Sequence, residues 1–316
     1  AVNPLLGILL ICIPGFIVSG QSVAESQDAG VTLVVLGTVQ DGGSPHIGCA
    51  RSCCAPLQKT PDPGRMVVSL GISDARSGKR YLFEATPDIS RQLHDLGRGG
   101  RAEPDAVPDG IFLTHAHIGH YTGLMFLGKE ALGARQVPVF AMPRMRSFLE
   151  ENGPWSQLVA SGNIRLEPLR AGAVVTLGES LEVTPLQVPH RDEYSETVGF
   201  LIRGPRQKVL FIPDIDKWER WETPIERLLS EVDVAFVDAT FYDAAEIGYR
   251  DISQIPHPFV SESRGRWDNL PAAMRRKVHF IHLNHTNPLL APDSAASQST
   301  RAAGYRIARR GQKFRL

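Results

Sequence analysis

The chain has 316 residues, of which 42% are hydrophobic and 22% are charged, a composition typical of a globular protein with a large core. Its 34 lysine and arginine side chains balance 34 aspartate and glutamate side chains, so the formal net charge is +0. Without a net positive charge or a basic run, bulk electrostatics give no reason to expect a nucleic acid partner. Length by itself allows one large domain or two.

The N-terminus differs from the rest of the chain, because residues 1–24 contain no charged side chain. An apolar run at 5–18 is followed by Ser22, Val23 and Ala24, the small-x-small pattern of a cleavage site, so residues 1–24 are predicted to be a secretory signal peptide. An uncleaved membrane anchor is the alternative, which the short run and Pro14 disfavour. We therefore expect an exported protein, periplasmic or secreted. Residues 25–316 would form a single domain with no membrane partner.

Short apolar runs rich in β-branched residues, separated by turn residues, predict strands along the chain. In the first half these strands are residues 31–36, 66–70, 81–83, 110–113 and 137–141. Predicted helices alternate with them, at residues 89–96, 121–132 and 144–151.

The second half repeats this pattern, with predicted strands at residues 164–169, 173–177, 181–187, 198–203, 208–212, 234–237, 278–281 and 306–314. Residues 198–203 and 208–212 are expected to pair as a hairpin, and residues 218–230 to form a helix. No low-complexity linker divides the halves. The pattern predicts an α/β protein, an αββα sandwich of two packed mixed sheets flanked by helices.

Three histidines, His115, His117 and His120, lie close together between a predicted strand and a predicted helix. On extended backbone His115 and His117 point to the same side, and His120 returns from the first helical turn. Imidazoles that converge in this way predict a metal site. The alternative is a solvated histidine-rich loop.

Further polar residues follow the ends of apolar strands in the second half: His190, Asp214 and His282. Side chains at strand ends, and in the loops after them, are where sites are built on such scaffolds. These residues are therefore expected to join the three histidines.

The chain resembles the metallo-β-lactamase superfamily in the order and spacing of His115-x-His117-x-x-His120, His190, Asp214 and His282. Within it the chain is most similar to coenzyme PQQ synthesis protein B, in segments 86–89, 119–124, 237–240 and above all 280–290. The cysteine cluster at residues 49–54, with His285, also resembles the cyclic phosphodiesterase of phosphonate breakdown. That enzyme carries a separate zinc on cysteines and one histidine.

The superfamily motif is His-x-His-x-Asp-His, and Gly119 stands here at the position of the aspartate. Carried over residue by residue, the resemblance implies one complete metal position, formed by His115, His117, His190 and Asp214. The second position keeps His120, the bridging Asp214 and His282 but lacks its carboxylate. The centre is then either mononuclear or completed by another group, for which the candidates are Asp41, His46, Asp238 and His257.

Three histidines and one aspartate suit Zn²⁺, with Fe or Mn as alternatives, and one or two ions are expected in the active site. Zinc lowers the pKa of bound water to about 7, which makes hydroxide at neutral pH. The predicted activity is hydrolysis of a small-molecule ester by metal-bound hydroxide, with a phosphodiester or cyclic phosphodiester favoured. His120 and Asp214 are the predicted catalytic residues. The alternatives are an oxidation that uses Fe, as the coenzyme PQQ synthesis protein B resemblance implies, and a non-catalytic, degenerate member.

The cysteines outside residues 1–24 are Cys49, Cys53 and Cys54. With His285 they are assigned, on the resemblance, to a structural zinc with closed Cys₃His coordination. The alternative is a disulfide between Cys49 and one of the other two, which would leave one thiol free. The sequence leaves a homodimer open.

Overall fold

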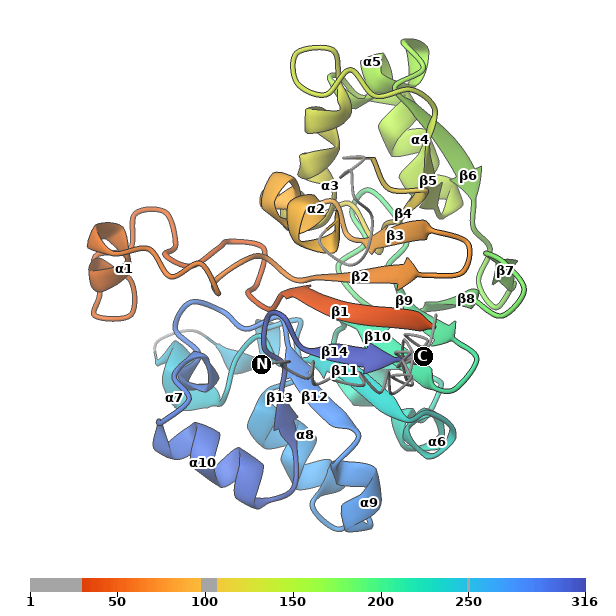
Figure 1. Ribbon diagram of the computed structural model, residues 1–316. Coiled ribbons are helices and arrows are strands. Elements are labelled where there is room, and N and C mark those ends of the chain that lie inside the picture. The colour runs from red at the N-terminus through yellow and green to blue at the C-terminus, as the bar shows by residue number, and fades with distance from the viewer. Residues whose placement is uncertain (1–29, 98–106, 249–250) are drawn as a thin grey trace, which may run out of the picture.

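Two packed mixed sheets form the centre of the computed structural model, which describes residues 30–97, 107–248 and 251–316 (Figure 1). The first sheet joins strands of the first half to the C-terminal strand, in the spatial order β14 (Lys313–Arg315), β1 (Val31–Gly37), β2 (Ser69–Asp74), β3 (Lys79–Phe83), β4 (Gly110–Phe112), β5 (Val137–Ala141) and β6 (Ile164–Pro168). Strands β3 to β6 run parallel, whereas β14, β1, β2 and β3 pair antiparallel.

The second sheet takes its strands from the second half of the chain. Their spatial order is β13 (Arg306–Ile307), β12 (Val278–Ile281), β11 (Val234–Asp238), β10 (Lys208–Ile212), β9 (Val198–Arg203), β8 (Glu182–Gln187) and β7 (Val175–Thr176). Strands β10 to β13 run parallel, and β7 to β10 pair antiparallel. The predicted hairpin of residues 198–203 and 208–212 is therefore confirmed.

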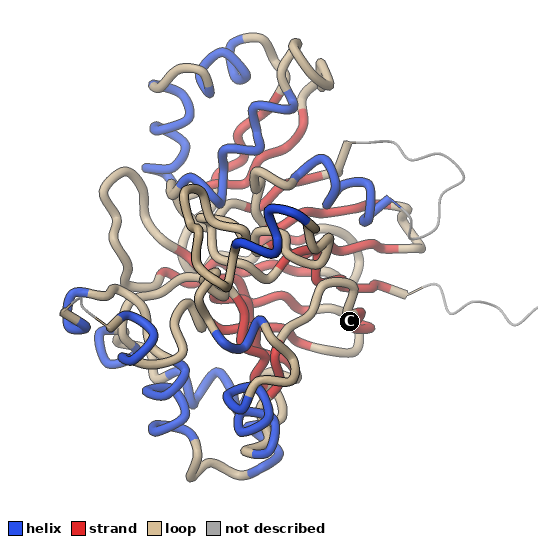
Figure 2. Tube along the Cα trace, turned by 90° about the vertical axis from the view of Figure 1, so that its left-hand side faces the viewer, coloured by secondary structure: helices blue, strands red, loops and turns tan. Residues whose placement is uncertain are grey.

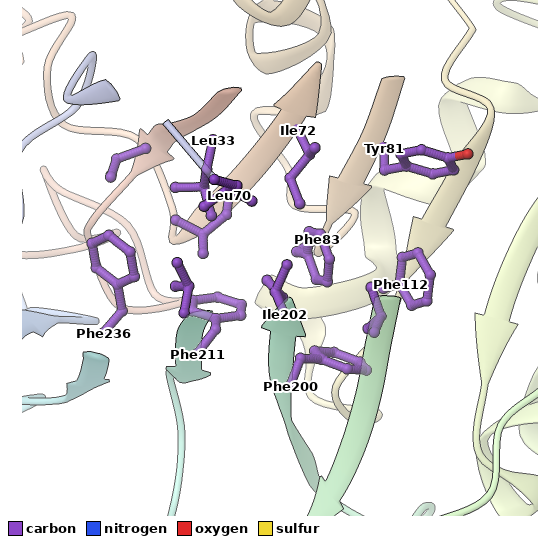
Figure 3. Close-up of a cluster of buried hydrophobic side chains, with 14 of the residues drawn as sticks. Leu33, Leu70, Ile72, Tyr81, Phe83, Phe112, Phe200, Ile202, Phe211 and Phe236 are labelled. Carbon is purple, nitrogen blue, oxygen red and sulfur yellow. The ribbon is translucent and has the colours of Figure 1, made fainter. Parts of the chain in front are cut away.

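An apolar core fills the space between the sheets, where side chains of both point toward one another (Figure 3). Phe83 and Phe112 of the first sheet stack with their ring centroids 4.9 Å apart. Phe200 of the second sheet meets these two rings edge-on, at 5.4 and 5.7 Å. Each such fully buried side chain stabilises the fold by roughly 1.5–3 kcal/mol, so this layer fixes the two sheets against each other.

Helices cover the outer faces of both sheets, which completes the four layers (Figures 1 and 2). The first sheet is covered by α2 (Ile89–Gly97), α3 (Ile118–Tyr121), α4 (Pro143–Glu151) and α5 (Trp155–Ala160). The second is covered by α6 (Ile225–Glu231), α8 (Val260–Trp267), α9 (Ala272–Arg275) and α10 (Ala295–Ala302). The short helices α1 (Ala55–Lys59) and α7 (Ala244–Ile247) lie in loops, α1 on a projecting arm. The predicted αββα sandwich is confirmed.

The single helix predicted at residues 121–132 is wrong. The short α3 is followed by a 3₁₀ segment, η1 (Thr122–Leu127). The Gly123 amide donates to Ala85 O at 2.9 Å, outside the helix, and glycine is a poor helix former. His120 therefore lies in α3 itself, one turn beyond His117.

The helix predicted at residues 218–230 is also wrong, because it is two segments, a 3₁₀ turn η2 (Trp218–Arg220) and α6. Pro224 separates them, since proline has no amide hydrogen and disfavours helical backbone in the preceding residue. The strand predicted at 306–314 is likewise two strands, β13 and β14, which join different sheets. Gly311, with φ of 84°, makes the turn between them.

The predicted signal peptide at residues 1–24 lies outside the described residues. Within residues 30–97, 107–248 and 251–316, no helix has both the length and the apolar character needed to cross a bilayer. Export of the protein stays a prediction.

Candidate metal centre

Strand ends of both sheets bring histidine and aspartate side chains together at one edge of the sandwich. Asp214, after β10, is 3% exposed and lies at the centre of this group. Its Oδ2 is 3.3 Å from Nε2 of His115, which follows β4. Its Oδ1 is 3.2 Å from Nε2 of His190, which follows β8. His282 reaches the same edge from the end of β12, because β10, β11 and β12 run parallel.

The first group of ligand atoms comes from His115, His117, His190 and Asp214, all within 4.8 Å of one another. His115 Nε2 and His117 Nδ1 are 2.8 Å apart, so two imidazole nitrogens face the same point. Both ring nitrogens of His190 are buried, and within the described part of the chain they have no hydrogen-bond partner. A cation at this point would satisfy His190 Nε2, and three imidazoles with one carboxylate suit zinc.

The second group contains His120, His282 and Asp41, whose ligand atoms also lie within 4.8 Å of one another. Asp214 Oδ2 lies 3.8 Å from His120 Nε2 and 4.0 Å from His282 Nε2, so one carboxylate stands between the two groups. His282 has a φ of 64°, in the left-handed region that non-glycine residues seldom adopt. Backbone strain of this kind persists only where the surrounding packing holds the residue in place.

Oxygen atoms hold the outer ring nitrogens of these histidines. The contacts are Thr114 Oγ1 with His115 Nδ1 at 2.8 Å, Glu193 Oε2 with His117 Nε2 at 3.2 Å, Glu84 Oε2 with His120 Nδ1 at 3.2 Å, and Thr240 Oγ1 with His282 Nδ1 at 2.8 Å. Such contacts fix the tautomer and orientation of a ligand imidazole. None of these oxygen atoms was predicted from the sequence as a partner of the histidines, although Glu84, Thr114 and Thr240 each closely follow an apolar strand.

Asp238, a candidate ligand from the sequence, lies behind the ligands. Its oxygens accept hydrogen bonds from Ile215 N, Thr240 N, Thr240 Oγ1 and His257 Nδ1, at 3.1, 2.8, 2.6 and 2.9 Å. A carboxylate offers about four acceptor positions, so Asp238 is saturated and positions Thr240, which in turn holds His282.

His257, the other candidate from this side, is paired with carboxylates. Its Nδ1 lies 3.1 Å from Asp214 Oδ1 as well as 2.9 Å from Asp238 Oδ2. Burial acts to lower the pKa of His257, but Asp238 and Asp214 outweigh it and raise the pKa to about 10. Asp214, Asp238, His257 and His282 also form a compact group, with ligand atoms within 4.8 Å of one another, and His257 Nδ1 is shared between the two carboxylates of that group.

Burial also sets the ionisation of the first group. It lowers the pKa of His115 well below its ordinary value, with His120 adding to the effect. For Asp214, burial acts to raise the pKa, but the neighbouring His190, His257 and His282 hold it well below its ordinary value. A neutral imidazole and an ionised carboxylate are the forms that bind metals.

Thr240→Val tests the support of His282, because valine keeps the shape of threonine and removes the hydroxyl that contacts His282 Nδ1. We expect the zinc affinity of the centre to fall about 10–100-fold, the usual effect of losing such a contact. Competition with a chromophoric chelator measures this affinity. Thr300→Val is the matched control, since Thr300 is also buried and its Oγ1 has no hydrogen-bond partner among the described residues. Equal affinities for both variants would contradict the assignment.

The cysteines form a separate group with His285. Ligand atoms of Cys49, Cys53, Cys54 and His285 lie within 4.8 Å of one another, as the assigned structural zinc site requires. The Sγ atoms of Cys49 and Cys53 are 3.8 Å apart, too far for a disulfide, and all three thiols are free. His46, a candidate for the catalytic centre, lies here instead. Its ring stacks on that of His285 with centroids 4.5 Å apart.

Residues 79–282, which carry every histidine and aspartate of the first group, match the sequence profile of the beta-lactamase superfamily domain. The chain belongs to the beta-lactamase superfamily. Among curated members, coenzyme PQQ synthesis protein B of Nitrosococcus oceani is 28% identical over 303 residues, 87% of this chain and 96% of the relative. The corresponding protein of Methylobacterium radiotolerans is 25% identical over 310 residues, 90% of this chain and 99% of the relative.

Solved structures of the beta-lactamase superfamily share the fold. Zn²⁺-bound PqqB from Methylobacterium extorquens superposes with a TM-score of 0.72 at 21% identity, covering 90% of this chain and 100% of that one. A diphosphatase of the PhnP family gives a TM-score of 0.62 at 21% identity, with 90% and 97% covered. The superfamily, and the likeness to coenzyme PQQ synthesis protein B, are thus confirmed. The donor set of His115, His117, His190 and Asp214 is of the kind that binds zinc.

Proposed function

We propose that the protein is a metal-dependent hydrolase of a small phosphoester, with a phosphodiester or cyclic phosphodiester as substrate. The observation that carries the proposal is Asp214, a buried carboxylate with histidine ligand atoms on both sides. Zinc held by these residues would supply a Lewis acid for a phosphoryl oxygen and a water molecule of lowered pKa. The superfamily membership and the structural likeness to a PhnP-family diphosphatase support cleavage of a phosphorus–oxygen bond.

The protein's own contribution is to hold each ligand in one orientation and one ionisation state before a substrate arrives. Thr114 and Thr240 fix the rings of His115 and His282, and the neighbouring His190, His257 and His282 hold the pKa of Asp214 well below its ordinary value. Groups arranged in advance need no reorganisation during the reaction, which is the largest source of electrostatic catalysis in many enzymes.

A positively charged side chain, Arg191, lies on the solvent side of the centre. Arg191 follows the ligand His190 directly, and its guanidinium is 56% exposed and lies 3.7 Å from Glu193 Oε1. Glu193 in turn contacts His117 at 3.2 Å. An exposed guanidinium next to the ligands supports an anionic substrate, because arginine binds phosphate groups through several donors at once.

His117→Ala tests the proposal. We expect the metal content to fall and kcat/KM for bis(p-nitrophenyl) phosphate to drop by about three orders of magnitude, since bound metal contributes several kcal/mol to such reactions. A panel of a phosphomonoester, a 2′,3′-cyclic nucleotide and a diphosphate ester would define the substrate class. His94→Ala is the control, because His94 is an exposed histidine of α2 outside the metal groups. Unchanged metal content and hydrolysis in His117→Ala would sink the proposal.

A second candidate function, oxidation that uses Fe, is supported by the curated relatives that carry the name coenzyme PQQ synthesis protein B. Elemental analysis of the purified protein distinguishes the two. Iron together with oxygen consumption favours the oxidation, whereas zinc without oxygen consumption favours hydrolysis.

A further inference from the structure

Gly119, which stands where the superfamily motif has its aspartate, lies directly against Asp41. A Cβ atom built on Gly119 would be 1.8 Å from Cβ of Asp41 and 2.4 Å from its Cα. Both distances are far below any non-bonded approach, and the obstructing atoms belong to the root of the Asp41 side chain, which cannot swing aside. The Asp41 side chain therefore starts where a side chain of residue 119 would start.

The carboxylate of Asp41 faces the incomplete half of the centre. It forms a compact group with His120 and His282, in which all ligand atoms lie within 4.8 Å of one another. Both histidines are fully buried, and their Nε2 atoms lack a hydrogen-bond partner in the described part of the protein. Two buried imidazole nitrogens without partners, next to a carboxylate, are the donor set of a second metal position.

Backbone hydrogen bonds tie Asp41 to the loop that carries His282. Gln40 N donates to Leu283 O at 2.9 Å, and Leu283 N donates to Thr38 O at 2.8 Å. A tight turn follows, in which Gly43 N donates to Gln40 O at 2.9 Å and Gly43 has a φ of 79°. Asp41 therefore lies in a turn whose base is paired with the residue next to His282, so the carboxylate is held in place.

We propose that Asp41, from the N-terminal loop, supplies the carboxylate ligand of the second metal position in place of the side chain absent at Gly119. The proposal rests on the proposed metal-dependent function and makes the centre binuclear, with His120, His282, Asp41 and the shared Asp214 on this side. It also explains the glycine, because Asp41 and any side chain at position 119 exclude each other sterically.

Asp41→Asn tests the ligand role through metal content. After metal removal and dialysis against buffered Zn²⁺, we expect Asp41→Asn to hold one zinc ion fewer per chain than the wild type, with a native circular dichroism spectrum. Asp62→Asn is the control, because Asp62 lies in the same connection between β1 and β2 and contacts Arg65 instead of a histidine. Equal zinc content of Asp41→Asn and wild type, or a wild-type centre that takes up only one ion, would overturn the proposal.

Exchanging the two residues tests the steric relation independently of activity. We expect Gly119→Asp to lower the melting temperature of the metal-free protein or to prevent folding, because its Cβ meets Asp41. Adding Asp41→Gly is expected to restore both the melting temperature and the second zinc ion. A double variant no more stable than Gly119→Asp alone, or one lacking the second ion, contradicts the proposal.

The two proposals can fail separately. If the wild type binds the second zinc through Asp41 but cleaves no phosphoester, the proposed function fails and the ligand assignment stands. If Asp41→Asn keeps all its zinc while the wild type hydrolyses the diester, the ligand assignment fails and the function stands.

Discussion

Asp214→Asn is expected to remove metal from both halves of the metal centre and to abolish the proposed hydrolysis. Asp214 is the only carboxylate among the described residues that faces His115 and His190 on one side and His120 and His282 on the other. Asparagine keeps the size of the side chain, but it has no charge and turns one oxygen into a hydrogen-bond donor. We expect kcat/KM to fall by about three orders of magnitude or more.

Metal analysis and thermal unfolding check this expectation together. Zinc should stabilise the wild type against unfolding through the catalytic centre, by mass action, and this part of the stabilisation should be absent in Asp214→Asn. Asp216→Asn is the matched control, because Asp216 is also buried in the same loop but contacts Lys217 and Arg220. If the Asp214→Asn variant holds as much zinc as the Asp216→Asn variant, the carboxylate of Asp214 binds no metal.

Cys53→Ser is expected to remove a different zinc ion and to destabilise the fold. Cys53 belongs to the group that links the N-terminal loop to His285, three residues beyond the ligand His282. Losing a structural metal is among the few changes that cost about 4 kcal/mol or more, which for a domain of this size lowers the melting temperature by about 10 °C. We expect one zinc ion fewer per chain.

Ser52→Ala, at the exposed neighbour of Cys53, controls for local changes in the loop and should keep the zinc. Thiol titration of the chain from residue 25 onward, denatured and free of metal, tests the same group independently, because it counts how many of the three cysteines are free. Three reactive thiols agree with a zinc site, and a single reactive thiol would establish the disulfide instead.

This cysteine group and the proposed Asp41 ligand belong to one structural unit. The loop at residues 38–54 meets the loop at residues 282–287 twice, through the backbone pairs around Val39 and Leu283 and through the cysteines with His285. Asp41 lies between these two contacts along the chain. We therefore expect Cys53→Ser to weaken zinc binding at the second catalytic position as well, which competition with a chelator would measure.

Local sequence features determined a large part of this molecule. The period of apolar residues placed most strands of both sheets, because a strand with one or both faces buried needs apolar side chains at fixed intervals. It was wrong for residues 66–70, since β2 is Ser69–Asp74, and for residues 306–314, which form two strands. The rule that sites are built at strand ends predicted from the sequence that His115, His190, Asp214 and His282 lie together. The helix predicted at residues 218–230 missed the break at Pro224, although that break follows from the chemistry of one residue.

Other features depend on contacts between residues far apart in the chain. Glu84, Thr114 and Thr240 hold ligand histidines, yet only the packing of the two sheets shows which imidazole nitrogen each one meets. The segment after His120 is 3₁₀ and not α-helical, because Gly123 donates to Ala85 in another loop.

The motif at residues 115–120 shows most clearly which features depend on local sequence and which depend on contacts between distant residues. The sequence by itself determined the three histidines and the absence of the aspartate at Gly119, because both are properties of six consecutive residues. Only the tertiary structure decided what occupies the space left by that glycine. The pairing of Val39 with Leu283 places Asp41 in that space. The steric exclusion between positions 41 and 119 cannot be predicted from the spacing of residues in the sequence, because the two positions are far apart in the chain.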